Sequence, residues 1–344
     1  MTAGVAEAAP KPTPQKWTLA KRGNVPGDDG LGALAVTGRK SAWAAGSIWQ
    51  GKPLLFRWNG GWNRVKLPAH VNVSLDELDA TSDKNVWAFG SDRSSALKAF
   101  RWNGKTWKAA VVERGEVSTW DADVVSASNV WLSVEEHSGR GQLRNWNGRK
   151  WRSMRVPAAS RLYGLSFSSA KNGWAVGLKA NGSGALAARW NGSSWKSTPL
   201  PRIQMPKGAT SELSSVLALS SRNVYAVGSY SWMVDDDEEH RPIVLHWNGS
   251  KWRRLAGPNL HAGLSGLSTD GRGGLWMKAG VDKLANYRAG RWTVAPIPGR
   301  AGQHVSVDAM ANVPGTATIL GVGSIWPDGG SQPNTQDSVF FTAR

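Results

Sequence analysis

The chain alternates between short apolar stretches and clusters of turn residues, and this alternation is periodic. In residues 73–112, four apolar stretches, LDELDAT, NVWAFGS, LKAFRW and TWKAAVV, are separated by Ser, Asp, Asn and Gly. Apolar runs of this length between turn residues are typical of β-strands. The pattern therefore predicts a unit of four short strands.

Two tryptophan-containing markers show how often this unit recurs. A second-strand marker, NVWAFGS at 85–91, has seven versions along the chain, mostly 43–44 residues apart. It is followed by an Asn-Gly turn marker, RWNGKTW at 101–107. Four strands repeated about every 40–50 residues are typical of β-propeller blades. The tryptophan after the turn recurs at Trp62, Trp107, Trp151, Trp195, Trp252 and Trp292, with Trp17 in the same local setting.

The markers predict an all-β fold, a seven-bladed β-propeller of four-stranded blades, formed by residues 16–344 after a flexible leader, 1–15. The segment SVFFTAR (338–344) has the pattern of a third strand. We expect the N-terminal strand, KWTLAK (16–21), to supply the fourth strand and to close the last blade. The expected blades span approximately 31–68, 73–112, 117–156, 160–200, 210–256, 262–298, and 303–344 together with 16–21.

The repeat carries a family resemblance. Its VWAVG-type marker and WNGxxW turn resemble the tryptophan-rich β-propeller repeats of secreted bacterial proteins, common in actinobacteria. This resemblance covers residues 16–344 and implies the propeller fold, whereas functions in that family are largely unassigned. In architecture and composition the chain is also similar to propeller lectin subunits of actinomycete toxin particles, which implies carbohydrate binding.

Composition narrows the class of protein. Hydrophobic residues make up 40% and charged residues 19% of the chain, as in a globular protein rather than a disordered one. There is no cysteine and no apolar run of roughly 18–20 residues, so we expect neither disulfides nor a membrane span. The Ala/Pro-rich start suits a secreted protein whose signal peptide is absent from this sequence, and a disordered cytosolic start is the alternative.

The net charge of +17 favours an anionic partner such as an acidic cell-wall polymer. Many Lys and Arg residues lie beside the repeated tryptophans, where charge on outer strands also prevents sheet-to-sheet aggregation. Single-stranded nucleic acid is not the expected partner, because its binding sites combine basic residues with exposed aromatic rings and these are separated here.

Seventeen of the 21 tryptophans fall on repeated positions and are predicted to pack between blades. The other four belong to one face of the propeller, which carries the second-to-third strand loops and the blade crossings and is here called the loop face. Trp49, Trp232 and Trp326 are expected in such loops, and Trp120 near the start of an innermost strand, with Tyr163 at the equivalent position of the next blade. The candidate ligand-binding residues on the loop face are Trp49, Gln50, Trp120, Tyr163, Tyr230, Trp232, Trp326, Asp328, His70, His261 and His304.

Aromatic rings flanked by Gln, Asn, Asp and His suit carbohydrate, because the apolar face of a sugar stacks on a ring while its hydroxyls pair with polar groups. The leading prediction is a non-enzymatic, lectin-like propeller that recognises a cell-surface or cell-wall glycan without a cofactor. A scaffold subunit of a larger secreted assembly is the second prediction. These tryptophans could also simply cap the bases of loops.

A glycoside hydrolase or lyase at the mouth of the central channel is a further alternative. Such an enzyme needs two carboxylates about 5–10 Å apart. Asp79, Asp123 and Asp308 are expected at the same position of their blades, and an acid repeated in this way more often joins strands by hydrogen bonds. No GxSxG, HExxH or P-loop motif supports another enzyme class. The acids expected on inner strands are Asp76, Glu77, Asp79, Asp121, Asp123 and Asp308.

The run DDDEEH (235–240) is an acidic block in a basic protein. Its oxygens could coordinate a hard cation, but the run lacks the spaced acids and the central glycine of a calcium loop. A solvated loop is the preferred interpretation, and a docking site for a basic partner is the alternative. The weak candidate metal ligands are Asp235, Asp236, Asp237 and Glu238.

Overall fold

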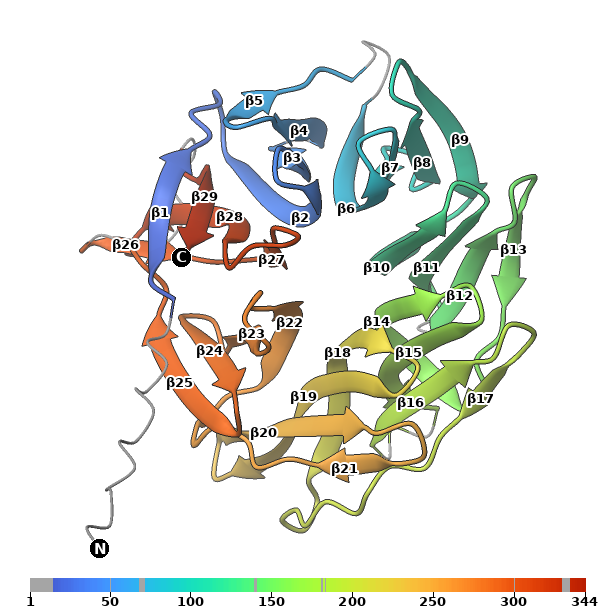
Figure 1. The fold of residues 1–344 in the computed structure, drawn as a ribbon, viewed down its shortest axis with the longest axis vertical. Helices are drawn as coiled ribbons and strands as arrows, with labels where there is room; N and C mark the ends of the chain where they lie inside the picture. Colours follow the sequence, from blue (N-terminus) through green and yellow to red (C-terminus); the bar gives the residue numbers. More distant parts are fainter. Residues whose placement is uncertain are drawn as a thin grey trace, which may run out of the picture.

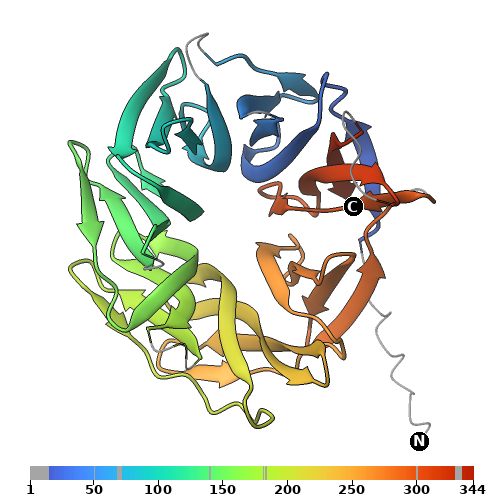
Figure 2. The same cartoon turned by 180° about the vertical axis from the view of Figure 1, so that it is seen from behind.

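The computed structural model describes residues 15–49, 51–67, 72–138, 141–180, 182, 184–299, 301–329 and 335–344. Seven antiparallel sheets form a ring around a central axis (Figure 1), and Figure 2 shows the same ring from behind. In six of the sheets the strand that comes first in the chain lies nearest the axis. The predicted seven-bladed β-propeller is confirmed.

Six blades consist of four strands that follow one another in the chain. Blade 1 contains β2 (Asp29–Gly38), β3 (Ser41–Ile48), β4 (Lys52–Trp58) and β5 (Trp62–Arg64). Blade 2 contains β6 (Val73–Ser82), β7 (Asn85–Asp92), β8 (Leu97–Trp102) and β9 (Trp107–Glu113). Blade 3 contains β10 (Val117–Ser126), β11 (Asn129–Glu136), β12 (Gly141–Trp146) and β13 (Trp151–Met154). Blade 4 contains β14 (Ala159–Ser169), β15 (Asn172–Lys179), β16 (Ala185–Trp190) and β17 (Trp195–Ser197). Blade 5 contains β18 (Thr210–Ser220), β19 (Asn223–Val234), β20 (Asp237–Trp247) and β21 (Trp252–Arg254). Blade 6 contains β22 (Leu264–Thr269), β23 (Leu275–Ala279), β24 (Lys283–Arg288) and β25 (Arg291–Pro296). In the described part of the chain, no helix is long and apolar enough to cross a membrane.

Blade 7 is built from both ends of the chain. Its inner strand is split into β26 (Gln303–Val305) and β27 (Ala309–Asn312), and both pieces pair with β28 (Ile319–Pro327). β28 pairs with β29 (Asp337–Ala343), and β29 pairs with β1 (Trp17–Arg22). The predicted closure of the last blade by the N-terminal strand is therefore confirmed.

The repeated Asn-Gly turn joins the third and fourth strands of a blade. In blade 2, Asn103 Oδ1 accepts hydrogen bonds from the backbone N–H groups of Lys105 and Thr106, both at 2.9 Å. Gly104 follows with φ of 94°, a left-handed conformation that glycine adopts without steric cost. The asparagine side chain and the glycine backbone together hold the turn closed. Asn147, Asn191 and Asn248 make the same pair of bonds in their blades.

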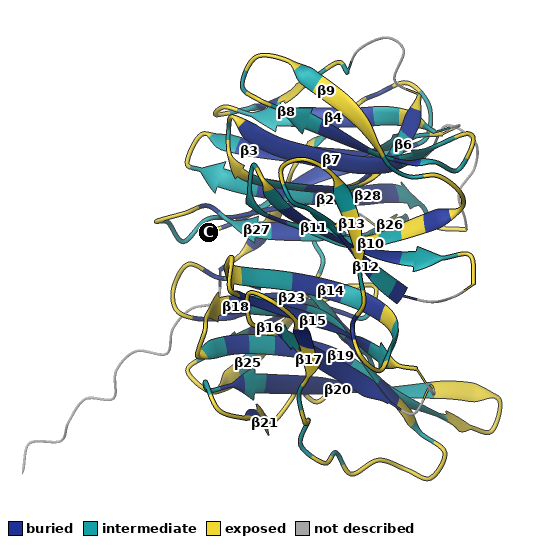
Figure 3. Cartoon of the chain, turned by 90° about the vertical axis from the view of Figure 1, so that its right-hand side faces the viewer, coloured by how far each residue is buried: buried dark blue, intermediate teal, exposed yellow. Residues whose placement is uncertain are grey.

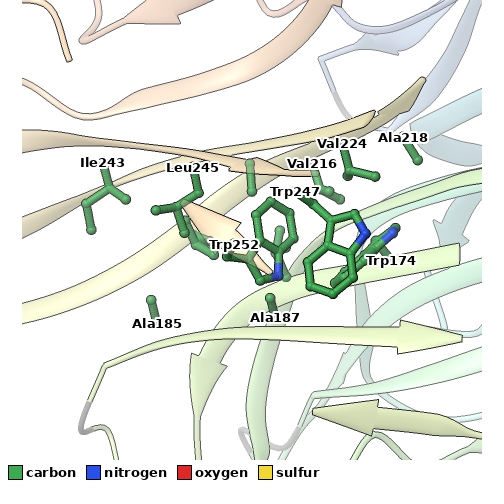
Figure 4. Packing of buried hydrophobic residues seen from close by; sticks show 13 residues of the cluster. Trp174, Ala185, Ala187, Val216, Ala218, Val224, Ile243, Leu245, Trp247 and Trp252 are labelled. Carbon is green, nitrogen blue, oxygen red and sulfur yellow. The ribbon is translucent and has the colours of Figure 1, made fainter. Parts of the chain in front are cut away.

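The two tryptophans beside this turn pack together against the preceding blade. Trp247 and Trp252 have ring centroids 5.8 Å apart, and both contact the fully buried Trp174, at 5.0 and 4.9 Å (Figure 4). We call this arrangement of one second-strand tryptophan and two turn tryptophans a tryptophan triad. The other triads are Trp43/Trp102/Trp107, Trp87/Trp146/Trp151 and Trp131/Trp190/Trp195.

The closing strand enters the same kind of interface. Trp17 of β1 meets Trp276 of blade 6 edge-to-face, with ring centroids 5.6 Å apart. The adjoining Gln15 is buried, accepts a hydrogen bond from Trp276 Nε1 at 2.9 Å and donates one to the Asp270 carbonyl at 3.0 Å. Between blades 7 and 1, Trp62 stacks on Phe340 at 4.6 Å. The ring is thus closed by aromatic contacts on both sides of blade 7.

The triads predict which tryptophans the fold needs. Trp174→Ala leaves a large cavity between blades 4 and 5, and we expect it to lower the free energy of unfolding by about 3–5 kcal/mol. Trp49→Ala is the matched control, because 72% of Trp49 is exposed, and it is expected to change that free energy by no more than about 0.5 kcal/mol. Equilibrium urea unfolding measures both. Equal losses would contradict the assignment of Trp174 to the core.

The closure of blade 7 predicts an effect of truncation. Deleting residues 1–22 removes β1, Trp17 and Gln15 and leaves β29 as an unpaired edge, so we expect a lower thermal midpoint and concentration-dependent association through that edge. Deleting residues 1–13 keeps β1 and Gln15 and serves as the control. Calorimetry and light scattering measure the two effects. A monomeric 1–22 deletion with an unchanged midpoint would show that closure by β1 is dispensable.

Candidate functional site

A β-bulge interrupts the innermost strand of five blades at the same place. The pairing with the second strand skips one residue there, and bulges re-aim the side chain of the extra residue. Trp120 and Tyr163 are two of these residues, so their predicted equivalence is confirmed. The five bulge residues are Gly32, Asp76, Trp120, Tyr163 and Ser214.

The axis of the ring contains a pocket of about 740 Å³, here called the axial pocket. Residues of all seven innermost strands line it, together with Lys278 of β23. Its wall combines carboxyl, hydroxyl and aromatic groups, which is the lining of a polar ligand site rather than of a packed core. The acidic lining residues are Glu77, Asp79, Asp121, Glu212 and Asp308, the serines are Ser166, Ser214, Ser215 and Ser265, and the aromatic ones are Trp120 and Tyr163.

Trp120 and Tyr163 form the centre of a cluster at this pocket. Their rings meet edge-to-face, with centroids 5.1 Å apart. Trp120 Nε1 donates a hydrogen bond to Glu135 Oε2 at 3.0 Å, and Arg161 Nε donates to Glu135 Oε1 at the same distance. Glu135 therefore fixes the indole, which is still 42% exposed. We call Trp120, Glu135, Arg161 and Tyr163 the mouth cluster.

The carboxyl groups on β6 and β10 share a desolvated environment. Burial raises the pKa of Asp79 to about 6 and the pKa of Asp121 to about 7. Burial, followed by repulsion from Asp121, Asp76 and Asp79, raises the pKa of Glu77 well above its usual value. Burial, followed by repulsion from Asp79, does the same for Asp123. Burial and mutual repulsion therefore favour the neutral form of these carboxyl groups.

Several of these side chains join neighbouring blades. Asp79 Oδ2 accepts a hydrogen bond from Val124 N at 2.6 Å, and Asp123 Oδ2 accepts one from Phe167 N at 2.8 Å. Asp121 Oδ2 likewise accepts from the backbone of blade 4 at 2.6 Å. The expectation that the repeated acids join strands thus holds for Asp79 and Asp123.

The predicted equivalence of Asp308 with Asp79 and Asp123 is wrong. Asp79 and Asp123 lie opposite the second-strand tryptophans of their blades. Asp308 instead donates its backbone N–H to Val322 O at 2.8 Å, beyond the position that corresponds to those tryptophans. The pairs Val305–Ile325 and Ala309–Val322 match Val73–Asp92 and Glu77–Phe89 of blade 2, so Asp308 corresponds to the bulge residue Asp76. The alignment was misled because blade 7 has Leu320 in place of the second-strand tryptophan that marks the register. Asp308 Oδ1 forms an ion pair with Lys278 Nζ at 3.5 Å.

Two further aromatic pairs lie on the loop face. His304 stacks on Trp326 with centroids 5.9 Å apart, and His304 Nε2 lies 3.3 Å from Asp328 Oδ1. This pair borders a groove of about 590 Å³ between blades 6 and 7. Tyr230 stacks on Trp232 at 5.7 Å. The structure therefore groups the predicted aromatic residues into pairs.

The remaining predicted residues are not part of these pairs. Within the described residues, the Trp49 side chain makes no ring contact and projects from the β3–β4 loop. His261 Nδ1 lies 2.8 Å from Glu239 Oε2. Gln50 and His70 fall outside the described residues.

The predicted loop positions of Trp232 and Trp326 are wrong. Trp232 lies in β19 and Trp326 in β28, because the second and third strands of blades 5 and 7 remain paired beyond the marker. The acidic run is likewise a hairpin rather than a loop, since Val234 pairs with Asp237 around a tight turn. Among the described residues, no group of three or more His, Asp or Glu side chains is placed to hold a metal ion, and this includes the candidates Asp235, Asp236, Asp237 and Glu238.

Sequence reasoning missed two residues that the repeat itself marks. Glu135 occupies the marker position that is Ser47, Ser91, Ser229 and Ser324 in other blades. Lys278 occupies a position that is apolar in five other blades, for example Val176 or Val227 in blades 4 and 5, and Ser133 in blade 3. Aligning the seven markers would have identified both as departures from the repeat.

Comparison with known proteins bears on the fold. Neither a family model nor a curated protein sequence matches the chain. Similar solved structures include YCF48 bound to D1 peptide (TM-score 0.58, 12% identity, 96% of each chain covered) and the SapL1 lectin in complex with α-methyl fucoside (TM-score 0.50, 12% identity, 78% of this chain and 95% of that one). The GH74 xyloglucanase from Xanthomonas campestris is also similar (TM-score 0.58, 14% identity, 94% of this chain and 55% of that one). At these identities the likeness shows the propeller fold alone, and these propellers differ in what they bind.

The raised pKa values predict a fold that loses stability as the pH rises. A carboxyl group with a higher pKa in the folded than in the unfolded chain contributes stability at low pH, and this contribution is lost as the pH passes the folded-state values of about 6 for Asp79 and about 7 for Asp121. Glu77→Gln removes one repelling carboxyl. Between about pH 5 and about pH 8, the free energy of unfolding should fall in both proteins. We expect the fall in Glu77→Gln to be about 1 kcal/mol smaller than the fall in the unsubstituted protein.

Urea unfolding at the two pH values measures this difference. Glu238→Gln is the control, because Glu238 is exposed in the β19–β20 hairpin, and its pH dependence should match that of the unsubstituted protein. Equal pH dependence in all three proteins would refute the repulsion at Glu77.

Proposed function

We propose that this propeller is an exported, non-enzymatic protein that binds carbohydrate on its loop face, at the mouth of the axial pocket. The observation that carries this proposal is the mouth cluster. It presents an exposed indole, held in place by Glu135, beside a polar pocket large enough for one or two sugar rings. The indole offers its apolar face to a sugar ring, while the carboxylates and serines of the pocket offer partners for hydroxyl groups.

The groove beside Trp326 supports a second subsite. Gln303, Asp282 and Lys278 line it together with the stacked His304 and Trp326. A single aromatic contact contributes about 0.5–1.5 kcal/mol, so one site alone binds weakly. Two subsites on one face raise the affinity for an extended chain through effective concentration. The expected ligand is therefore an oligosaccharide rather than a monosaccharide.

The state of the pocket carboxylates favours binding over hydrolysis. Asp79 and Asp121 accept backbone hydrogen bonds, and Asp308 lies against Lys278 and accepts a hydrogen bond from Ser306 Oγ at 2.9 Å. The other two acids of the lining, Glu77 and Glu212, belong to β6 and β18, on different sides of the ring (Figure 1). A glycosidase instead requires its acid and its base or nucleophile to face one bond from about 5–10 Å apart.

A protein-interaction role is the second candidate, and the β19–β20 hairpin favours it. This hairpin carries the acidic run at its tip, and Met233 and Val234 are exposed there to 62% and 44%. Exposed apolar side chains beside carboxylates suit a partner protein with a basic surface. Figure 3 shows how exposed residues gather on such projecting turns and outer strands, while the buried ones follow the middle of the blades.

Carbohydrate binding predicts a specific effect of the indole. Trp120→Ala is expected to weaken binding of the oligosaccharide selected on a glycan array by about 3- to 10-fold, which corresponds to the contribution of one stacked ring. Trp120→Phe keeps a ring but loses the hydrogen bond to Glu135, and we expect an intermediate affinity. Titration calorimetry measures both, with Met233→Ala as the control on the neighbouring hairpin. An array without a ligand, or a ligand whose affinity is unchanged in Trp120→Ala, would refute the proposal.

A further inference from the structure

We propose that the sugar bound at the mouth of the axial pocket carries a free amino group, as a glucosamine unit does. This inference rests on the proposed function and specifies the chemical class of its ligand. It begins from a contrast in charge. The chain has a net charge of +17, yet the axial pocket is lined by five acidic residues and a single basic one, Lys278.

Three of the five acids already have partners. Lys278 Nζ lies 3.5 Å from Asp308, so the one cation of the lining is used within the protein. Asp79 and Asp121 accept backbone hydrogen bonds at 2.6 Å. Glu77 and Glu212 make neither a hydrogen bond nor an ion pair with any described residue, and both are half-buried. These two carboxyl groups are available to a ligand.

Unpaired carboxyl groups in a confined pocket favour a cationic partner. Burial, followed by repulsion from Asp121, Asp76 and Asp79, raises the pKa of Glu77, and an ammonium group would favour its charged form and gain charge-assisted hydrogen bonds. The same charges repel sulfated, phosphorylated or carboxylated sugars. The anionic cell-wall polymer suggested by the net charge therefore does not fit this pocket.

The rest of the lining points to a sugar amine rather than to a lysine side chain. The exposed face of Trp120 attracts both a sugar ring and an ammonium group. Four serine hydroxyls, those of Ser166, Ser214, Ser215 and Ser265, surround the same space. Ser166 Oγ and Ser215 Oγ each accept a backbone hydrogen bond and keep an O–H group to donate. A pyranose hydroxyl can accept from such a group, whereas an aliphatic lysine stem cannot.

Two oligosaccharides of equal length test the inference directly. Oligomers of glucosamine and of N-acetylglucosamine share a backbone and differ in whether the amine is free or acetylated. At about pH 7 we expect the glucosamine oligomer to bind at least about tenfold more tightly by titration calorimetry. Because Glu77 and Glu212 lie on different sides of the ring, Glu77→Gln and Glu212→Gln should each lower this preference in part, and the double variant should abolish it. All three variants should leave the affinity for the acetylated oligomer unchanged. Asp236→Asn, which removes an exposed charge from the β19–β20 hairpin, should retain the preference.

The outcomes separate this inference from the proposed function. Trp120-dependent binding of a neutral sugar, with no preference for the amine, would overturn the inference and leave carbohydrate binding intact. A preference for the amine that persists in Trp120→Ala and extends equally to an oligolysine peptide would overturn both. Thermal midpoints of Glu77→Gln and Glu212→Gln at or above that of the unsubstituted protein establish that any loss of preference arises at the site and not from unfolding.

Discussion

Contact between aromatic rings of neighbouring blades is the interaction on which the rest of this molecule depends. A four-stranded sheet with two apolar faces cannot bury either face by itself, so each blade requires both neighbours. A tryptophan that buries about 150–250 Å² contributes about 4–6 kcal/mol as an upper estimate, and each triad brings three of them together. Because every ring contacts the next blade, the contribution is realised only when the circle is complete. The placement of Trp17 against Trp276 is the physical reason why the N-terminal strand completes the last blade.

The position of the triads also explains where variation is possible. Their tryptophans lie at the start of the second strand, the end of the third and the start of the fourth, which all meet on the face with the Asn-Gly turns. The loop-face ends of the strands are free of that constraint. Bulges interrupt five of the innermost strands, four of the bulge residues line the axial pocket, and these four differ from blade to blade, from Gly32 to Trp120. A uniform scaffold thus carries a non-uniform site.

The architecture could be predicted from the sequence because the same strand pattern recurs in seven units. The second-strand marker, the Asn-Gly turn and their spacing recur along the chain, so an uncertain strand assignment in one unit is corrected by the other units. The strand order and the closure of the ring follow from this spacing. The site was less accessible, because it depends on single departures from the repeat. Trp120 and Tyr163 were found as off-repeat aromatic residues, but Glu135, which holds Trp120, lies near the end of a second strand, β11, whose sequence otherwise follows the repeat. The register of Asp308 was mistaken because blade 7 has Leu320 where a second-strand tryptophan would mark the register.

The net charge of the chain and the local charge at the axial pocket differ in sign because basic and acidic side chains have different structural roles. Arg57, Arg101 and Arg189 lie over the second-strand tryptophans of their blades, with the guanidinium carbon 5.2–5.8 Å from the ring centroid. Such cation–π contacts stabilise the blade edge and leave the arginines committed to the scaffold. Several acids, by contrast, lie on the inner strands, where backbone amides of the next blade donate to Asp79, Asp121 and Asp123. A ligand at the axis therefore contacts mainly acidic side chains, although the protein as a whole is basic. The local charge of the pocket, and not the net charge of the protein, decides which ligands can enter.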